Sequence, residues 1–125
     1  MLLETKESKT GYLIPIDFDR LPFEPKRAFF VTNKNKGDIR GNHAHINEEH
    51  FLVCLSGCVK IKKQNKDNIK TITVRKAESL YQKELEWLRI EFLEKNTTLL
   101  VFSNSEYTEK NYIREYDKFL EIIKS

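Results

Sequence analysis

The sequence contains few of the residues that mark several protein classes. It has two cysteines, four glycines and three prolines among 125 residues. Neither a disulfide framework nor a flexible low-complexity linker is therefore expected. Cys54 and Cys58 lie within a strand-turn-strand pattern, and their spacing is not that of a zinc knuckle. We expect two free thiols and a reducing, cytoplasmic compartment.

Long apolar runs and a strong charge bias are also missing. No segment approaches the 18 apolar residues of a membrane span, and "MLLETKESKT" at the start has no apolar stretch of a signal peptide. The formal net charge is only +3, and the lysines are dispersed. We therefore expect neither a membrane nor a nucleic-acid partner, although a site for a phosphorylated small molecule remains open. The length suits one domain, residues 1–125.

Short segments of β type follow one another along most of the chain. Apolar and polar residues alternate in 58–64 and 69–74, with a turn signal at 66–68 between them. Further strands are predicted at 12–16, 27–33, 50–56, 87–93 and 97–103. The end differs, because apolar residues of 105–125 recur at helical spacing. The pattern predicts an all-β sandwich or barrel, jelly roll included, that ends in one or two short amphipathic helices.

Histidine is also scarce, and its distribution along the chain is uneven. All three histidines, His43, His45 and His50, lie within eight residues, close to Arg40. In a strand, side chains at i and i+2 share a face, so His43 and His45 can meet one ligand.

Three interpretations of this cluster compete. The first is a packed or surface group without chemistry. The second is a metal site, because the spacing from Gly37 through His43, His45 and His50 to Gly57 is similar to the first cupin motif; no later histidine completes that motif. The third is acid–base catalysis without metal, in which the two imidazoles move a proton and Arg40 holds a diphosphate or an enolate oxygen.

A longer pattern extends the resemblance to one family. "RGNHAH" (40–45) followed by "FLVCLSGCVKI" (51–61) resembles the signature of the sugar 3,4-ketoisomerases of the WxcM-like cupin family. "KRAFFVTN" (26–33) is similar to the preceding strand, and the "EW" that ends at Trp87 to a later tryptophan. The segment 99–122 is similar to the family's closing pattern of an apolar strand, a tyrosine and an acidic-rich tail.

The resemblance implies a fold, a reaction and an assembly. The fold would be a cupin jelly roll, a double-stranded β-helix, usually a homodimer that needs no metal or other cofactor. The reaction would move the ketone of a dTDP-linked 4-keto-6-deoxy hexose, dTDP-4-keto-6-deoxyglucose, from C4 to C3 through an enediolate. The products would be precursors of 3-amino sugars for bacterial surface glycans. By position, His43 and His45 would be the catalytic acid–base pair, and Arg40 would contact the substrate.

Three positions depart from the family pattern. Ile46 replaces a common lysine, and His50 replaces a common glutamine. Phe29-Phe30 occupy the place where the family often carries a tyrosine with its hydroxyl in the site. Tyr81 is then a candidate for another proton donor, or the activity is altered.

Other residues complete the list of candidates for substrate binding. Trp87 could form a wall against a sugar or base, or could be core packing. Arg27 could reach a phosphate, and Glu91 could enter the site if its strand face lines the interior. The full set comprises Arg27, Arg40, Asn42, His50, Tyr81, Trp87 and Glu91. Alternatives to the isomerase are a non-catalytic or metal-binding cupin module and a related nucleotide-sugar epimerase.

Overall fold

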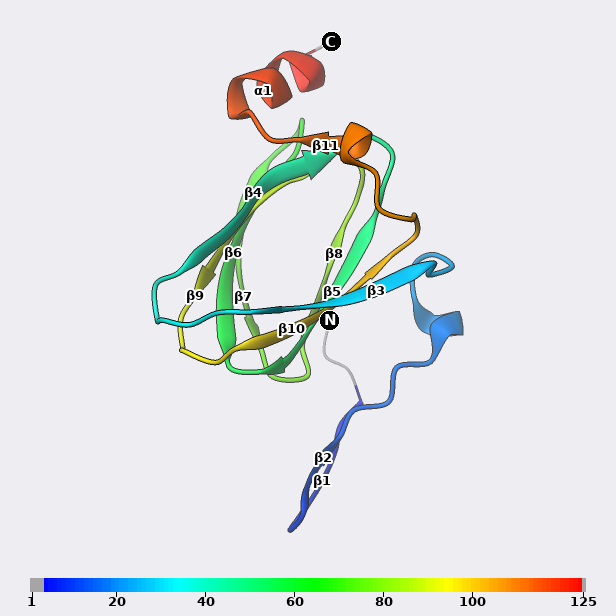
Figure 1. Cartoon of the computed structure of the whole chain (residues 1–125), viewed down its shortest axis with the longest axis vertical. Helices are drawn as coiled ribbons and strands as arrows, with labels where there is room; N and C mark the ends of the chain where they lie inside the picture. Colours follow the sequence, from blue (N-terminus) through cyan, green and yellow to red (C-terminus); the bar gives the residue numbers. More distant parts are fainter. Residues whose placement is uncertain (1–3, 125) are drawn as a thin grey trace.

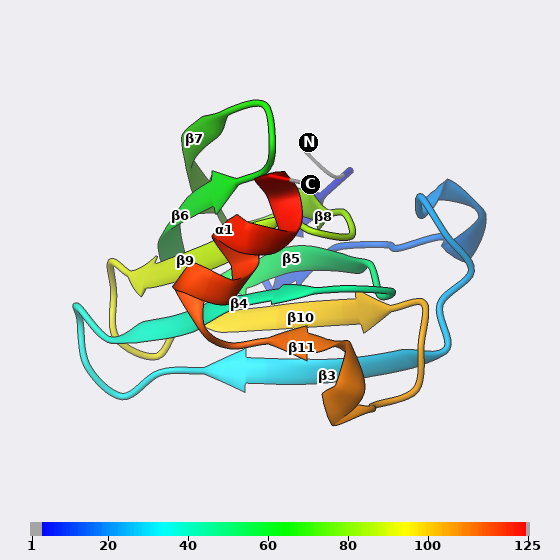
Figure 2. The same ribbon diagram turned by 90° about the horizontal axis from the view of Figure 1, so that it is seen from above.

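Two antiparallel sheets face each other in the computed structural model, which describes residues 4–124 (Figures 1 and 2). The first sheet has the order β3 (Arg27–Thr32), β10 (Thr98–Ser103), β5 (His50–Ser56), β8 (Ser79–Gln82). The second has the order β11 (Tyr112–Ile113), β4 (Ile39–His45), β9 (Trp87–Phe92), β6 (Cys58–Gln64), β7 (Ile69–Arg75). Strands that are close in sequence are split between the sheets, as in a jelly roll. The predicted all-β cupin fold is confirmed.

Alternation explains which side chains fill the space between the sheets. Val59 and Ile61 of β6 are fully buried, whereas the alternating Lys60 and Lys62 are exposed. Leu88, Ile90 and Phe92 of β9 point inward in the same way. A period of two therefore places one face of each strand in a common core, in agreement with the sequence pattern.

The first strands form a separate hairpin. β1 (Lys6–Ser8) pairs with β2 (Gly11–Leu13) and projects from the barrel at the end opposite the C-terminal helix (Figure 1). The strand predicted over 12–16 therefore ends at Leu13. Pro15 has no N–H to donate to a ladder, which explains why the pairing does not continue. A single 3₁₀ turn, η1 (Phe18–Arg20), precedes β3.

The C-terminal segment corrects the helical prediction in part. Helix α1 covers only Tyr116–Lys124, after the 3₁₀ turn η2 (Glu109–Asn111) and the short strand β11. Tyr112 and Ile113 pair with His45 and Ala44 of β4, because the free edge of that strand has backbone groups to satisfy. The buried Phe119 of α1 packs on the outer face of this sheet.

An irregularity in β4 determines where the side chains of Arg40 and His43 point. The pairing with β9 shifts between Gly41 and His43, and both Gly41 (φ 85°) and Asn42 (φ 57°) have left-handed backbone. A Cβ on Gly41 would lie 2.9 Å from the carbonyl oxygen of Leu88, so only glycine allows this approach. Because the bulge adds one residue, Arg40 and His43 face the same side although they are three apart.

Candidate active site

The space between the sheets opens into a cavity of about 220 Å³. Its wall combines apolar and polar side chains. The lining contains two histidines, two arginines, one glutamine and one tyrosine, but no carboxylate. The lining residues are Phe29, Val31, Arg40, Gly41, His43, His50, Leu52, Gln82, Leu88, Ile90, Leu99, Val101, Tyr112 and Arg114.

The three histidines form one continuous group of rings. The centroids of His43 and His45 are 4.9 Å apart, and those of His45 and His50 are 4.1 Å apart. His43 and His50 line the cavity from opposite sheets, whereas His45 is completely buried between them. Tyr112 lies against His43 and His45, with centroids 5.2 and 4.7 Å away. The histidine nearest a ligand is therefore His43 or His50, with His45 behind them.

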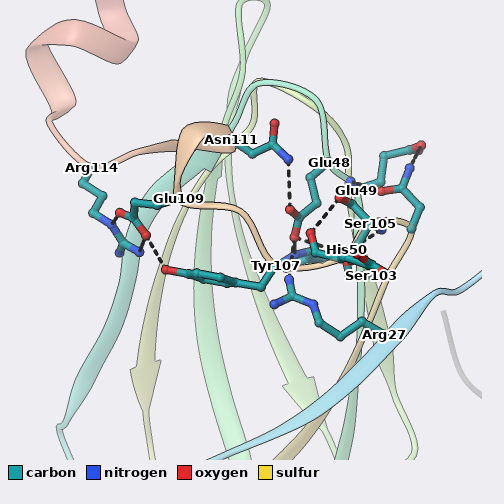
Figure 3. A network of polar contacts seen from close by, with 12 residues as sticks. Arg27, Glu48, Glu49, His50, Ser103, Ser105, Tyr107, Glu109, Asn111 and Arg114 are labelled. Atoms are coloured by element: carbon teal, nitrogen blue, oxygen red, sulfur yellow. Dashed lines mark hydrogen bonds and ion pairs between the residues drawn. The ribbon is translucent and has the colours of Figure 1, made fainter.

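A buried carboxylate holds His50 in place (Figure 3). Glu48, which has no exposed surface, accepts a hydrogen bond from Nε2 of His50. The same carboxylate accepts bonds from Arg27 Nη2 at 2.8 Å, Ser103 Oγ at 3.0 Å and Asn111 Nδ2 at 3.4 Å. Four donors from four segments thus fix one side chain. Glu48 was not among the site residues predicted from the sequence.

Burial lowers the pKa of all three imidazoles. The pKa of His45 falls to about 2, first through loss of hydration and then through repulsion from His50 and His43. The same loss of hydration, with the charges of His43 and Arg27, lowers the pKa of His50 to about 3. The pKa of His43 is also lowered, chiefly by burial. At neutral pH the cavity therefore presents neutral imidazoles that are able to accept a proton.

These shifts predict that the protein loses stability as the pH falls from 7 to 5. Below 6.5, the ordinary histidine value, His45 and His50 bind protons in the unfolded chain but not in the folded protein. Each then lowers the free energy of unfolding by up to about 1.4 kcal/mol per pH unit. Urea unfolding at several pH values measures this slope. His45→Asn is expected to reduce it, and a stability independent of pH over this interval would contradict the burial of neutral histidines.

A metal ion was one of the three interpretations of the histidine cluster. Among the described residues, ligand atoms of His45, Glu48 and His50 lie within 4.8 Å of one another. Both ring nitrogens of His45 are buried without a hydrogen-bond partner, as in a vacant ligand. Glu48, however, already accepts four hydrogen bonds, one from the Arg27 guanidinium, which would repel a cation. This triad does not fit a metal ion while Arg27 is in place.

Two arginines lie at the lip of the cavity. Arg40 lines it from β4 and is exposed. Arg114 lines it from the segment after β11, and its guanidinium donates to Glu109 at 2.5 and 3.0 Å and covers the Tyr112 ring at 4.6 Å. From the sequence, Tyr112 and Arg114 were expected in a helical tail, and neither was predicted to line the site. Their match to the family's closing pattern was the signal that could have identified them.

Several predicted contact residues lie outside the cavity. Tyr81 points outward from β8, where its hydroxyl donates to Glu49, so it is not the alternative proton donor of this cavity. Trp87 is buried on the outer face of β9, 5.4 Å from Tyr116 and 5.5 Å from Phe119 in ring centroids. Glu91 shares that face and is 3.7 Å from Lys60.

The remaining two candidates also have other neighbours. Asn42 is turned outward by the bulge and lies in a depression with Trp87 and Arg89. Arg27 contacts Glu48, and its guanidinium lies 5.0 Å from the centroid of the Phe29 ring. Arg27 thus orients Glu48 and does not line the cavity. Of the predicted residues, the structure brings His43, His50 and Arg40 together in the cavity, with His45 behind them.

The rest of the described chain adds two findings. Cys54 and Cys58 are both free thiols. Within residues 4–124, no helix has the length and apolar character needed to cross a bilayer.

Comparisons with known proteins agree on one family. The model of the family described as "WxcM-like, C-terminal" matches residues 1–124. A TDP-4-oxo-6-deoxy-alpha-D-glucose-3,4-oxoisomerase from Aneurinibacillus thermoaerophilus is 30% identical over 115 residues, which cover 90% of this chain and 83% of the relative.

Solved structures agree with this assignment. A sugar 3,4-ketoisomerase from Thermoanaerobacterium thermosaccharolyticum, in complex with TDP, superimposes with a TM-score of 0.88 at 32% identity, covering 98% of this chain and 91% of that one. A 3,4-ketoisomerase from Helicobacter canadensis gives a TM-score of 0.89 at 28% identity, covering 99% and 95%. The epimerase from Mycobacterium tuberculosis, at 13% identity and a TM-score of 0.75, covers 90% and 65% and shares the fold alone.

These relatives confirm the predicted family, and the enzyme class predicted for the chain, an isomerase, is the class of its named relatives. The family resemblance of "RGNHAH" and the C-terminal tail is therefore supported by the family model, by a sequence relative and by solved structures. This chain belongs to the WxcM-like, C-terminal family, whose named relatives here are TDP-sugar 3,4-ketoisomerases.

Proposed function

We propose that this chain is a TDP-sugar 3,4-ketoisomerase that moves the ketone of TDP-4-keto-6-deoxyglucose from C4 to C3. The observation that carries the proposal is the lining of the cavity, in which neutral His43 and His50 face a space bordered by Arg40 and Arg114. A relative from Thermoanaerobacterium thermosaccharolyticum, with one histidine replaced by asparagine, was solved in complex with this sugar nucleotide. Residues 1–125 would act as one catalytic domain.

His43 is the proposed base that removes the proton from C3. It lines the cavity, and its lowered pKa keeps the ring neutral at pH 7, ready to accept a proton. Removal of this proton next to the C4 carbonyl produces an enediolate. His45 acts in this proposal through its contact with the His43 ring, because it has no surface in the cavity.

The arginines at the lip provide the positive charge that the substrate requires. An enediolate oxygen and a diphosphate are both anionic, and a guanidinium offers a planar fork of donors to either. Within residues 4–124 no carboxylate forms an ion pair with Arg40, whereas the Arg114 guanidinium is oriented by Glu109. A cavity of about 220 Å³ suits the sugar, with the nucleoside diphosphate at the lip.

Loss of the Arg40 charge is expected to weaken nucleotide binding. We expect Arg40→Ala to raise the Kd for TDP by roughly tenfold, because a charge-assisted hydrogen bond to a phosphate is lost. Isothermal titration calorimetry with TDP measures the change. The matched control is Arg89→Ala, which removes the same charge from the outer face of the neighbouring strand. Equal affinities in wild type and Arg40→Ala would remove Arg40 from the phosphate site.

The oligomeric state, the compartment and the use of the product are also proposed from the family resemblance. We propose a homodimer in the cytoplasm that supplies keto sugars for amination and for surface glycans such as O-antigen or S-layer glycan. The projecting β1–β2 hairpin, with Tyr12 and Leu13 exposed, and Phe30, 67% exposed on edge strand β3, offer apolar surface for a second copy. Analytical ultracentrifugation tests the dimer.

The test of the proposed function is conversion of the sugar nucleotide by purified protein. A proton NMR time course with TDP-4-keto-6-deoxyglucose should show loss of the 4-keto sugar and growth of a 3-keto isomer. A chelator should not slow the reaction, because no proposed step uses a metal. Binding of TDP without turnover would favour a binding module, and a product with altered configuration but an unmoved ketone would favour an epimerase.

A further inference from the structure

The cavity contains a second histidine for which the proposed function has no role so far. His50 lines the wall from β5, in the sheet opposite to that of His43. Its Nε2–H donates to Glu48, so the neutral ring carries its proton on that nitrogen. No hydrogen-bond partner of Nδ1 is found among residues 4–124, and Nδ1 is therefore the nitrogen left for a ligand. A carboxylate that fixes one imidazole nitrogen and frees the other is an arrangement suited to proton transfer.

The surroundings of Glu48 make this arrangement rigid. Arg27, Ser103 and Asn111 donate to the same carboxylate from β3, β10 and the turn before β11 (Figure 3). The ring of Phe29 packs edge-on against His50 at 5.7 Å between centroids. His50 is only 4% exposed, so its ring has little freedom to turn away. The His50 ring is therefore held in one orientation.

The reaction itself needs a second proton carrier. Moving a ketone from C4 to C3 breaks the C3–H and O3–H bonds and forms C4–H and O4–H bonds, with no net oxidation. His43 accounts for the proton that leaves C3. The other side chains of the cavity wall that could move a proton are His50 and the phenol of Tyr112. Phe29, which lies against His50, has no hydroxyl.

We propose that His50 carries the second proton, with Glu48 as its positioning residue; this rests on the proposed ketoisomerase function. After His43 has taken the C3 proton, Nδ1 of His50 accepts the proton of the C3 hydroxyl. The imidazolium formed beside the Glu48 carboxylate then gives its proton to C4 of the enediolate, and with this step C3 becomes the carbonyl carbon. The protonated His43 returns its own proton to O4. Every bond broken is thus balanced by one formed, and no other reactant is needed.

Because His43 and His50 each carry one proton in this proposal, a His50 variant should retain the first proton transfer and lose the second. In deuterated buffer, exchange at C3 of the substrate reports removal of the first proton, and appearance of the 3-keto sugar reports delivery of the second. His50→Gln keeps a polar side chain of similar size but cannot transfer a proton. We expect its C3 exchange to stay within about threefold of wild type, while product formation falls at least 100-fold. Glu48→Gln, which keeps the shape but not the charge, should lower the ratio of product to exchange about tenfold.

Tyr112→Phe is the comparison that decides between the two candidate carriers. We expect it to leave the ratio of product to exchange unchanged. The proposal is overturned if Tyr112→Phe alone separates the two half-reactions, if His50→Gln forms product at the wild-type rate, or if His50→Gln loses exchange and product to the same degree while it remains folded and binds TDP. Failure of the ketoisomerase proposal is distinct, because wild-type protein would then give neither exchange nor product.

Discussion

His43→Gln is expected to reduce turnover of TDP-4-keto-6-deoxyglucose by 10²- to 10⁴-fold, the usual contribution of a positioned general base. Glutamine fills a similar volume and forms hydrogen bonds, but it cannot accept the C3 proton. Affinity for TDP should change by less than about threefold, because the nucleotide is held at the arginine lip. The ring of His43 lines the cavity and is only half-buried, so the variant is expected to fold.

Steady-state kinetics and TDP titration together test this role. A loss in kcat with unchanged affinity for TDP is the signature of an interaction made only in the transition state. Arg89→Ala, on the outer face of the adjacent strand, is the control for nonspecific effects and should retain wild-type turnover. A fully active His43→Gln would exclude His43 as the base and transfer that role to another group of the cavity.

Gly57→Ala is expected to cause the largest loss of stability from a single methyl group. Gly57 joins β5 to β6 with φ +83°, and a Cβ at this position would lie 2.1 Å from Oγ1 and 2.8 Å from Cα of Thr97. Thr97 is fully buried and cannot move freely, since its N–H donates to Asn33 at 2.8 Å and its hydroxyl to the Glu94 carbonyl at 2.9 Å. Backbone strain of about 1–2 kcal/mol and overpacking of about 1–3 kcal/mol predict a total loss of about 2–5 kcal/mol.

Gly37→Ala provides a matched control for this prediction. Gly37 also has a left-handed backbone, φ +92°, but a Cβ there would have no atom within 4 Å. It should therefore lose only the backbone term, about 1–2 kcal/mol. Denaturant unfolding of the three proteins compares the two effects. Equal losses in both variants would show that the contact with Thr97 is unimportant.

Most strands could be predicted from the sequence because apolar and polar residues alternate along them. In β6 and β9 the buried residues Val59, Ile61, Ile90 and Phe92 recur at every second position, and the turns between strands contain glycine or polar clusters. Strand β8 was missed because Ser79–Gln82 is short and has little alternation. Strand β11 was missed because it forms by pairing with the free edge of β4. This contact joins residues that are far apart in the sequence.

Alternation along a strand does not by itself show which of the two faces points into the space between the sheets. Trp87 and Glu91 share one face of β9, and the sequence left open whether this face lines the interior. The apolar Leu88 and Ile90 occupy the interior instead, while α1 covers Trp87 from outside. Glu48 could not be identified from the sequence as part of the site, because the donors that surround it come from four different segments of the chain.

The most direct test of the central claim is the position of deuterium in the product. Wild-type protein is incubated with TDP-4-keto-6-deoxyglucose in deuterated buffer, and the 3-keto product is examined by proton NMR. The account predicts that a deuteron from solvent occupies C4 of the product, while unconverted sugar gains deuterium at C3. A product without deuterium at C4 would contradict proton transfer by solvent-exchanging histidines, and the absence of any product or exchange would contradict the ketoisomerase itself.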